Sequence, residues 1–387
     1  MKRVLVCGAG WAGMNAARIL AQRGHSVRIL EKSDHPGGRI NSEVVNGFTL
    51  DAGFQVVNPA YAELQETGVL ERVTIYPLPK GVEILDGEKL RLVGDFRQSL
   101  RYLADDVSSW SGSIRAKIAL LRYLRSTAAD LSFGAATVEL ADLYERVLAP
   151  FLTGVFLTDP AEVSNKMARE LIHWFLKGAP GVPAGGVGEI SKVMAAELDI
   201  EFGVEVISVS KSEVQTSNGR EEADAVIVAL DPVGAAALLG VEAPRMNQST
   251  TWYFKCDRGL LSSKHLRLGG VGPVINSVVI SNTAPSYAPP ESSLLAATTL
   301  SLGDEDQVRR QLAALWRINP SELDLIKRWE IPHSLPFHAP GVALARTALM
   351  ESGIYVAGDW RNVPSQQGAL VSGRIAANAI SAGKSIP

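Results

Sequence analysis

The chain has 387 residues, a formal net charge of −3 and 46% hydrophobic residues, so it can bury a large core. The near balance of acidic and basic residues argues against a nucleic-acid surface, which needs clustered Lys and Arg. With two cysteines, no disulfide framework is expected, and the predicted location is a reducing cytoplasm. No apolar run approaches the length of a transmembrane helix. Composition predicts no particular oligomeric state.

The first predicted element is an apolar strand, residues 4–7, that runs into a Gly-x-Gly-x-x-Gly turn and then a helix. Gly8 permits the tight turn, Gly10 lets the backbone approach a pyrophosphate, and Gly13 lets helix pack against strand. The helix, expected over residues 12–23, directs its free N–H groups and positive dipole end at the phosphates. Trp11 and Ala12 open this helix and belong to the expected nucleotide contacts.

A second predicted strand, residues 26–30, ends at Glu31, about 20 residues beyond the glycines. An acid there binds the ribose hydroxyls and disfavours the 2′-phosphate of NADP. Lys32 follows it and is included among the expected nucleotide contacts. The turn, helix, second strand and acid fall in register, so the sequence predicts a Rossmann-type site for NAD or FAD.

Later segments carry a family resemblance. They are Gly37-Gly38-Arg39, the Gly-Phe-x-x-Asp-x-Gly segment over residues 47–53, the strand-like residues 223–230, Gly358-Asp359, and residues 367–374. On these segments the chain resembles the flavin-containing amine oxidase superfamily, which also holds protoporphyrinogen oxidases, phytoene desaturases and carotenoid isomerases. The resemblance implies FAD, and an α/β fold in which a Rossmann-type FAD-binding domain carries an inserted mixed α+β substrate domain.

The positions of these segments predict a discontinuous domain arrangement. Residues 1–60, 185–240 and 345–387 are expected to form the FAD-binding domain, and residues 61–184 and 241–344 the substrate domain. Within the substrate domain, helices are expected over residues 113–126 and 137–148, and strands over residues 249–255 and 294–300.

The resemblance implies further FAD contacts. Gly37, Gly38 and Arg39 are expected near the phosphates, and Val206, on a strand over residues 204–206, at the adenine edge. Asp359, after Gly358, is expected to accept hydrogen bonds from the ribityl hydroxyls.

A helix over residues 369–380, entered through Gln367, Gly368 and Ala369, is expected to stabilise negative charge on the reduced flavin ring. Covalent family members use a cysteine near this motif. Residues 357–373 contain none, so the FAD is expected to be noncovalent.

Two residues are candidate catalytic groups. Gln55, which follows the expected FAD contacts Gly53 and Phe54, either lines the face of the flavin ring or bonds to its own loop backbone. Many amine-oxidising relatives place a lysine near flavin N5 on a substrate-domain strand. The corresponding stretch here, residues 249–254, has no lysine until Lys255 at its end, which departs from that pattern and leaves an exposed strand-end residue as the alternative.

Three aromatic residues have two possible interpretations, and other features predict no catalytic or metal site. Trp174, Phe175 and Trp360 either wall a pocket or fill the core. Cys7 is expected to be an inert core residue. The glycine-rich residues 183–190 follow no apolar strand, so no second dinucleotide site is expected. The histidines show no metal-ligand spacing, and no metal site is predicted.

Residues 114–125 combine apolar side chains with four basic ones on an expected helix. Such a helix either packs its apolar stripe into the core, which is the favoured interpretation, or rests on a membrane surface. The predicted function is that of an FAD-dependent oxidoreductase that transfers a hydride from a mostly apolar small molecule, an amine or a polyene, to flavin N5. The alternatives are an isomerase that uses reduced FAD without net redox turnover, and a non-catalytic flavoprotein binding subunit.

Overall fold

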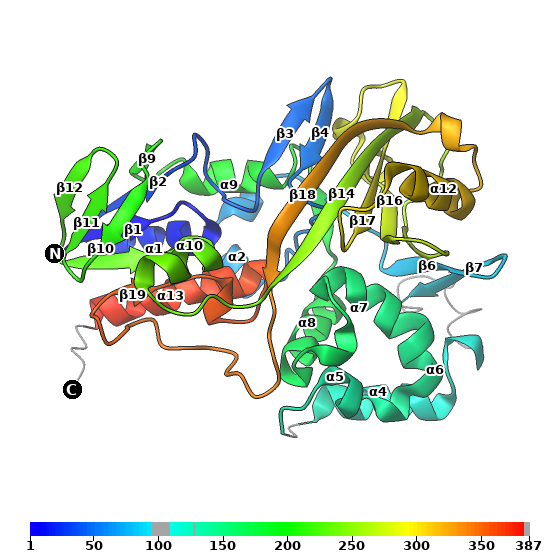
Figure 1. Cartoon of the computed structure of the whole chain (residues 1–387), viewed down its shortest axis with the longest axis horizontal. Coiled ribbons are helices and arrows are strands. Elements are labelled where there is room, and N and C mark those ends of the chain that lie inside the picture. The colour runs from blue at the N-terminus through cyan, green and yellow to red at the C-terminus, as the bar shows by residue number, and fades with distance from the viewer. Residues whose placement is uncertain (95–108, 127–128, 383–387) are drawn as a thin grey trace.

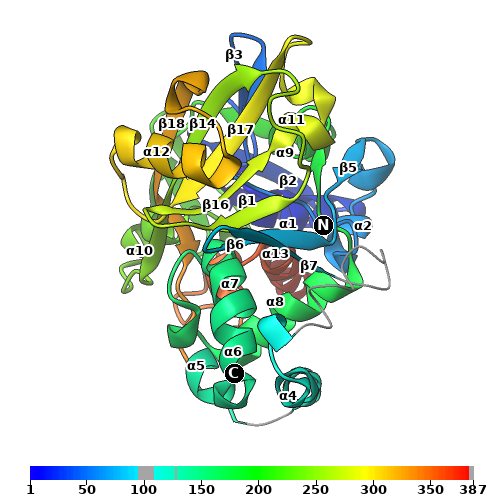
Figure 2. The ribbon, with the colours of Figure 1, turned by 90° about the vertical axis from the view of Figure 1, so that its right-hand side faces the viewer.

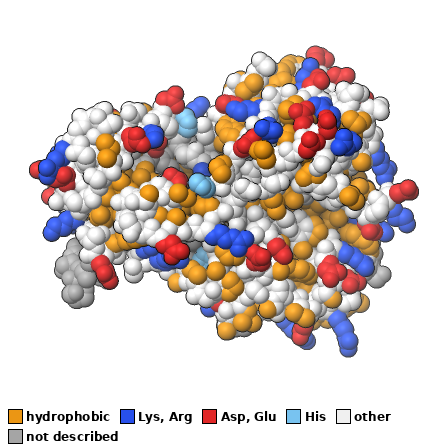
Figure 3. All heavy atoms as spheres, in the orientation of Figure 1, with side chains coloured by type: hydrophobic (Ala, Val, Ile, Leu, Met, Phe, Trp, Pro, Cys, Tyr) orange, Lys and Arg blue, Asp and Glu red, His pale blue; other side chains and the backbone are white. Residues whose placement is uncertain are grey.

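The computed structural model describes residues 1–94, 109–126 and 129–382. One end of the molecule in Figure 1 holds a parallel sheet with its helices, and the other holds a second sheet and a group of helices. The architecture is therefore mixed α/β, as the sequence predicts. Acidic and basic side chains are interspersed across the face shown in Figure 3.

The parallel sheet gathers strands from distant parts of the sequence. Its order is β19, β13, β1, β2, β9, and every neighbouring pair is parallel. The bounds are β1 (Arg3–Cys7), β2 (Ser26–Glu31), β9 (Ile200–Phe202), β13 (Ala225–Val228) and β19 (Tyr355–Val356). The carboxyl ends of β1, β2, β13 and β19 meet at one edge, which is where parallel α/β sheets bind ligands.

Helices cover this sheet because its central strand is apolar along its length. Val4, Leu5 and Val6 are fully buried, as expected for a strand covered on both faces. The helix after β1 lies beside the last helix of the chain in Figure 1, and Met14 and Leu370 share their buried cluster. The helices of this part are α1 (Trp11–Gln22), α2 (Ala62–Gln65), α9 (Val187–Ala195), α10 (Pro232–Leu239) and α13 (Gln366–Ser381).

The described residues also form three small sheets. An antiparallel sheet contains β10 (Val206–Val209), β11 (Glu213–Thr216) and β12 (Gly219–Glu222). One hairpin pairs β3 (Ser42–Val45) with β4 (Phe48–Asp51), and another pair joins β5 (Ile75–Pro77) to β8 (Gly181–Pro183).

A seven-stranded mixed sheet forms the other end of the molecule, in the order β18, β14, β17, β16, β15, β6, β7. Its bounds are β6 (Gly81–Asp86), β7 (Lys89–Gly94), β14 (Met246–Asp257), β15 (Leu266–Gly269), β16 (Val274–Val279), β17 (Ser292–Thr299) and β18 (Asp324–Pro336). On one face, α12 (Glu305–Trp316) packs Val308 and Leu312 against the buried Trp252 and Phe254. α11 (Ile280–Thr283) follows β16.

The other face of this sheet is turned toward a helical segment. Figures 1 and 2 agree in placing these helices on one side of the sheet. They are α4 (Ile114–Arg125), α5 (Phe133–Ala136), α6 (Ala141–Leu143), the π-helix η5 (Tyr144–Leu148), α7 (Ala149–Phe156) and α8 (Asn165–Lys177). The remaining 3₁₀ turns are η1 (Val69–Glu71), η3 (Ser109–Ser111), η4 (Val138–Leu140), η6 (Pro160–Glu162), η7 (Pro285–Tyr287), η8 (Pro320–Glu322) and η9 (Asp359–Arg361).

Most predicted elements match the observed ones, but several bounds differ. The strand expected over residues 204–206 is β10, which begins only at Val206, and the helix expected over residues 369–380 is α13, which begins at Gln366. The strands expected over residues 249–255 and 294–300 correspond to β14 and β17, and the helix expected over residues 113–126 is α4. The single helix expected over residues 137–148 is wrong, because Ala141 has a φ of 40° and divides the stretch into η4, α6 and η5. The domain boundaries stay a prediction.

Candidate functional site

The glycine turn lies where the predicted phosphate site requires it, between β1 and α1. Gly8 has a φ of 107°, and an added Cβ would lie 2.7 Å from the Ala229 carbonyl oxygen, so only glycine fits. A Cβ at Gly13 would overlap the Gly8 carbonyl oxygen, which keeps α1 close to the turn. A Cβ at Gly10, by contrast, would meet no atom within 4 Å.

The first turn of α1 is suited to an anion. Gly10 is its N-cap and supplies no side-chain cap, so the first N–H groups of this helix have no capping side chain. Gly8, Gly10, Trp11 and Ala12 line a large cavity, whereas Gly13 packs away from it. The open space at Gly10 beside an uncapped helix end fits the pyrophosphate of a dinucleotide.

Glu31 ends β2 close to the glycine turn. Its carboxylate accepts hydrogen bonds from the Ala9 N–H at 2.7 Å and from the Ser33 N–H at 2.9 Å. Lys32 forms an exposed ion pair with Glu205 at 2.6 Å, and Val206 opens β10 next to it. Glu31, Lys32 and Val206 all line the cavity, so the three predicted contacts at the adenosine end are brought together.

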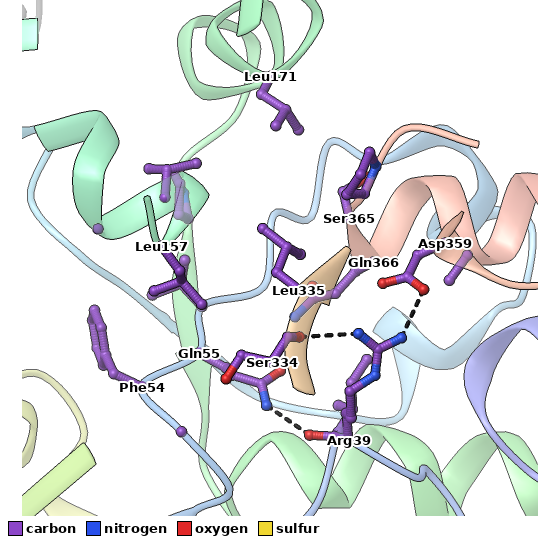
Figure 4. Close-up of a pocket in the computed structure, with 18 of the residues that line it drawn as sticks. Arg39, Phe54, Gln55, Leu157, Leu171, Ser334, Leu335, Asp359, Ser365 and Gln366 are labelled. Carbon is purple, nitrogen blue, oxygen red and sulfur yellow. Dashed lines mark hydrogen bonds and ion pairs between the residues drawn. The ribbon is translucent and has the colours of Figure 1, made fainter. Parts of the chain in front are cut away.

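Arg39 and Asp359 link the two ends of the chain. The Arg39 Nη2 lies 2.7 Å from Asp359 Oδ1, and its Nη1 donates to the Ser334 carbonyl at 3.0 Å (Figure 4). Burial opposes the charge, but the Asp359 carboxylate and its hydrogen bond raise the pKa of Arg39. Both residues line the cavity, as do Gly37, Gly38 and Gly358.

The amino end of α13 reaches the cavity through different residues from those predicted. Ser365 caps the helix by accepting from the Gly368 N–H at 3.0 Å, and Ser365, Gln366 and Ala369 line the cavity. Gln367 instead points to α2, where its Oε1 accepts from the Glu63 N–H at 3.2 Å.

A Cβ at Gly368 would overlap the Val363 carbonyl oxygen, so this glycine packs against its own loop. Of the three residues predicted to enter this helix, only Ala369 therefore lines the cavity.

Gln55 bonds to its own loop backbone, as one of its two predicted interpretations requires, and the other interpretation, a place beside the flavin ring, stays a prediction. Its Nε2 donates to the Arg39 carbonyl at 2.8 Å and to the Ala52 carbonyl at 2.9 Å, so the loop backbone fixes its amide (Figure 4). Gln55 also lines the cavity together with Gly53 and Phe54. These residues are tied to the large sheet, because the Phe54 N–H donates to Thr251 Oγ1 at 3.1 Å.

Lys255 is not brought to the site. It lies four residues beyond Thr251 on β14, which corresponds to about 13 Å along a strand, and does not line the cavity. The sequence reasoning missed the neighbours that do line it, among them Ser249, Thr251, Ile331, Ser334 and Leu335. Alternation along β14 and β18 was the available signal, but it could not show which face meets the site.

The cavity has a volume of about 2280 Å³, whereas a typical ligand pocket has about 300–1,000 Å³. Beyond Gln55 it extends as an apolar arm between the large sheet and the helical segment. Leu157 and Leu171 lie across from Gln55 in Figure 4. The arm is lined by Leu120, Leu124, Val147, Phe151, Leu157, Leu171 and Phe175, among others.

Of the three aromatic candidates, Phe175 lines the cavity, whereas Trp174 and Trp360 do not. Phe175 lines the arm and packs edge-on against Phe151, with ring centroids 5.4 Å apart. Trp174 instead packs against Tyr61, and Trp360 belongs to a buried cluster with Val356.

The predicted helix over residues 114–125 lies at the edge of the arm. Ser113 caps it, and its Ala116, Ala119 and Tyr123 are buried, as the favoured core interpretation requires. Ile114 and Leu121 line the cavity and are nevertheless exposed, with 78% of Ile114 accessible. Among the described residues, no helix is long and apolar enough to span a bilayer.

A buried carboxyl group lies behind the site. Asp51, at the end of β4, accepts hydrogen bonds from Ser42 at 2.6 Å, from the Val187 N–H at 2.9 Å and from Tyr287 at 3.0 Å. Burial raises the pKa of Asp51 to about 6, and these hydrogen bonds oppose the increase. Asp51 therefore joins β4 to the start of α9 and to the loop after β16.

Both cysteines are buried. Burial raises the pKa of the Cys7 thiol to about 12 and that of Cys256 to about 11, which suits inert core cysteines. No group of three or more His, Cys, Asp or Glu side chains among the described residues is arranged to hold a metal ion.

The parallel sheet, glycine turn and acidic strand end define an α/β protein with a Rossmann-type turn at the wall of a long cavity. Residues 11–381 match the family model of flavin-containing amine oxidoreductases, and the chain belongs to that family. This is the family, and the class of oxidoreductase, that the sequence predicts.

Curated relatives match over short segments. A 4,4′-diapolycopene oxygenase from a Methylomonas species is 39% identical over 83 residues, which is 21% of this chain and 17% of that protein. A zeta-carotene-forming phytoene desaturase from Myxococcus xanthus is 46% identical over 56 residues, which is 14% of this chain and 11% of that protein. The matches thus span less than a fifth of these relatives.

Solved structures share the fold over nearly the whole chain. An oxidoreductase from Methanosarcina mazei has a TM-score of 0.74 at 16% identity, covering 96% of this chain and 99% of that one. A reduced UDP-galactopyranose mutase has a TM-score of 0.74 at 14% identity, covering 100% of this chain and 97% of that one.

Proposed function

We propose that this protein is an FAD-dependent oxidoreductase in which a hydride passes from a mostly apolar small molecule to flavin N5. The observation that carries this proposal is the continuity of the cavity. It runs from the glycine turn at Gly10, past Arg39 and Asp359, to the apolar arm lined by Phe151 and Leu171. A dinucleotide at one end and an apolar substrate at the other would meet beside Gln55.

The residues that would hold FAD lie in order along this cavity. The turn at Gly8 and Gly10 and the start of α1 would bind the pyrophosphate, with Gly37, Gly38 and Arg39 beside it. Glu31 would accept the ribose hydroxyls, next to Lys32 and Val206 at the adenine end. Without a cysteine in residues 357–373, attachment would be noncovalent.

The substrate end would be organised by Asp359, Gln55 and α13. Asp359 would receive hydrogen bonds from the ribityl chain, while Gly53, Phe54 and Gln55 would line the ring face. The amino end of α13, reached through Ala369, would favour negative charge near the ring. When bound, the flavin supplies the redox chemistry, and this chain contributes binding, orientation and exclusion of water.

The substrate class rests on the apolar arm and on the relatives. The arm suits an amine with a large apolar body or a polyene, and the two curated relatives are named as enzymes of polyenes. Residues 1–60, 185–240 and 345–387 would form the FAD-binding domain, and residues 61–184 and 241–344 the substrate domain. The exposed Ile114 would lie at the mouth of the arm, where contact with a membrane surface is a less favoured second role.

A second candidate function is an isomerase that uses reduced FAD without net redox turnover. The shared fold with a reduced UDP-galactopyranose mutase favours it, although this is an analogy at the level of fold. A non-catalytic flavoprotein subunit is the third candidate. The apolar arm beside Gln55 argues against it, because a mere binding subunit needs no substrate space at the flavin.

The test starts from the absorbance spectrum of the purified protein. Amines and polyenes are then added anaerobically while the oxidised-flavin band is followed. Bleaching by members of one panel would support dehydrogenation and name the substrate class. A bound flavin that no compound bleaches, with conversion only after chemical reduction, would move the assignment to the isomerase. Absence of flavin binding, even after reconstitution with FAD, would contradict the proposal.

A further inference from the structure

Three polar side chains form a row across the large sheet. Strand register pairs Asn276 of β16 with Thr298 of β17, and Thr298 with Thr251 of β14. Paired residues point to the same face of a sheet, and all three line the cavity. The next row on this face contains Val278, Ala296 and Tyr253, whose hydroxyl donates to the Asp51 carbonyl.

The members of this row differ in their hydrogen bonding. Thr251 Oγ1 accepts a hydrogen bond from the Phe54 N–H, so this hydroxyl already has a partner within the protein. The Thr298 hydroxyl is buried and has no hydrogen-bond partner among the described residues. The Asn276 amide makes no hydrogen bond within the same part of the chain, but it is not among the fully buried atoms that lack a partner, so it borders the open cavity. Asn276 and Thr298 are each 4% exposed as whole residues.

Packing by α7 keeps the Asn276 amide in place. A Cβ added to Gly154 would overlap Asn276 Nδ2, so a glycine at this helix position leaves room for the amide. Gly154 and the neighbouring Val155 and Leu157 also line the cavity. The amide is therefore held between helix and sheet at the wall of a mostly apolar space.

Among the described residues, the Thr298 hydroxyl is buried without a partner, and the Asn276 amide next to it has no partner within the fold. A buried polar group without a partner is destabilising, and most buried polar groups in native proteins have one. A ligand oxygen would supply the missing partner here. An amide donates and accepts, and so does a hydroxyl, so the pair suits a neutral hydroxyl or carbonyl group. The β15 residue that pairs with Asn276 is the apolar Leu268. Arg267 pairs with Ser277 on the opposite face and forms an ion pair with Glu83.

We propose that Asn276 and Thr298 form a subsite for a hydroxyl or carbonyl oxygen of the substrate. This inference rests on the proposed function and narrows it: the substrate is an apolar molecule with one neutral oxygen group, not a pure hydrocarbon. Neighbouring strands lie about 4.8 Å apart, so the subsite lies about 5–10 Å from Thr251 and its partner Phe54. The oxygen is thus several bonds from the carbon that reacts beside Gln55.

The test uses three probes with the same body: farnesol, farnesal and the hydrocarbon farnesene. Their dissociation constants for the flavin-loaded protein are measured by calorimetry and by the shift of the flavin absorbance band. Farnesol and farnesal should bind about tenfold more tightly than farnesene, which corresponds to the loss of one or two neutral hydrogen bonds. Asn276→Leu and the isosteric Thr298→Val should each weaken farnesol and farnesal binding while farnesene binding stays within about twofold.

Leu266→Ala is the matched control, because Leu266 lines the same cavity through an apolar side chain. It should weaken all three probes by a similar factor. Equal affinity for the three probes in the wild-type protein, or equal losses in Thr298→Val, would overturn the subsite while leaving the proposed function intact. If none of the probes binds the flavin-loaded protein, the apolar-substrate proposal fails and the subsite fails with it.

Discussion

The Arg39 guanidinium and the Asp359 carboxylate meet at 2.7 Å although they are 320 residues apart in the sequence. Arg39 follows the glycine pair after β2, and Asp359 follows β19, so their ion pair joins the two ends of the chain at the wall of the cavity. The Asp359 side chain is 7% exposed and that of Arg39 is 32% exposed. Because the pair is partly buried, losing one partner should destabilise the protein more than it would for a surface ion pair.

Removing Arg39 should destabilise the protein even without flavin. Arg39→Met leaves the Asp359 carboxylate nearly buried without its cationic partner, which should lower the free energy of unfolding by about 2–3 kcal/mol. The double variant Arg39→Met/Asp359→Asn should be more stable than Arg39→Met alone. Urea unfolding of the apoprotein measures both. Lys32→Met, which breaks the exposed pair with Glu205, is the control and should cost less than about 1 kcal/mol.

Alanine at two glycines of the same turn should have different effects. Gly8→Ala should lower stability, whereas Gly10→Ala should leave stability nearly unchanged and weaken FAD binding. Gly8→Ala forces an L side chain into a φ of 107° and against the Ala229 carbonyl, so the variant should lose about 2–4 kcal/mol of stability. Gly10 has a φ of −72° and open space around its Cβ position, so Gly10→Ala should stay within about 0.5 kcal/mol of wild type.

Gly10→Ala should nevertheless lose at least about tenfold in FAD affinity, because its methyl group would occupy the approach to the pyrophosphate. Thermal unfolding of the apoprotein and fluorescence titration with FAD separate the two effects. FAD binding by Gly10→Ala at the wild-type level would contradict the assignment of this turn to the phosphates.

The nucleotide end of the cavity can be predicted from the sequence because its signals are local. Gly8, Gly10 and Glu31 occupy fixed positions around one strand, helix and strand, and short-range spacing determines them. The residues of α13 that line the cavity are harder to predict from the sequence. The helix begins at Gln366 and not at Ala369, and each residue of helix turns a side chain by about 100°, so Gln367 faces α2.

The substrate end cannot be predicted in the same way. Thr251, Asn276 and Thr298 are ordinary polar residues within three separate strands, and only the register of a seven-stranded sheet brings them into one row. No local pattern reports such a long-range register. Lys255 illustrates the same difficulty, since its strand is predicted correctly and its position along the strand removes it from the cavity.

Asp51 should make stability depend on pH in a defined direction. Its pKa rises from 3.8 to about 6 on folding, so its contribution favours the folded state below about pH 4 and is lost as the pH rises through about 6. The change is on the order of 2–3 kcal/mol. Asp51→Asn cannot ionise and keeps groups able to bond to Ser42 and Tyr287, so its unfolding free energy relative to wild type should be higher at pH 7 than at pH 4.

Asp51→Ala is the contrasting variant, because it removes the acceptor for three hydrogen bonds and should be destabilised at both pH values. Chemical unfolding at pH 4, 5, 6 and 7 gives the comparison. A difference between Asp51→Asn and wild type that does not change with pH would show that this carboxyl group does not titrate as described.

Ile114 should affect substrate binding without affecting stability. It is 78% exposed and lines the cavity at its edge, so Ile114→Gln removes apolar surface from the mouth of the arm but little from the core. The free energy of unfolding and the FAD affinity should stay unchanged, while an apolar probe such as farnesene binds roughly threefold more weakly. Val138→Gln is the matched control, because Val138 is 75% exposed and lies outside the cavity lining. If both variants weaken the probe equally, the effect belongs to general surface hydrophobicity, and the arm does not open beside α4.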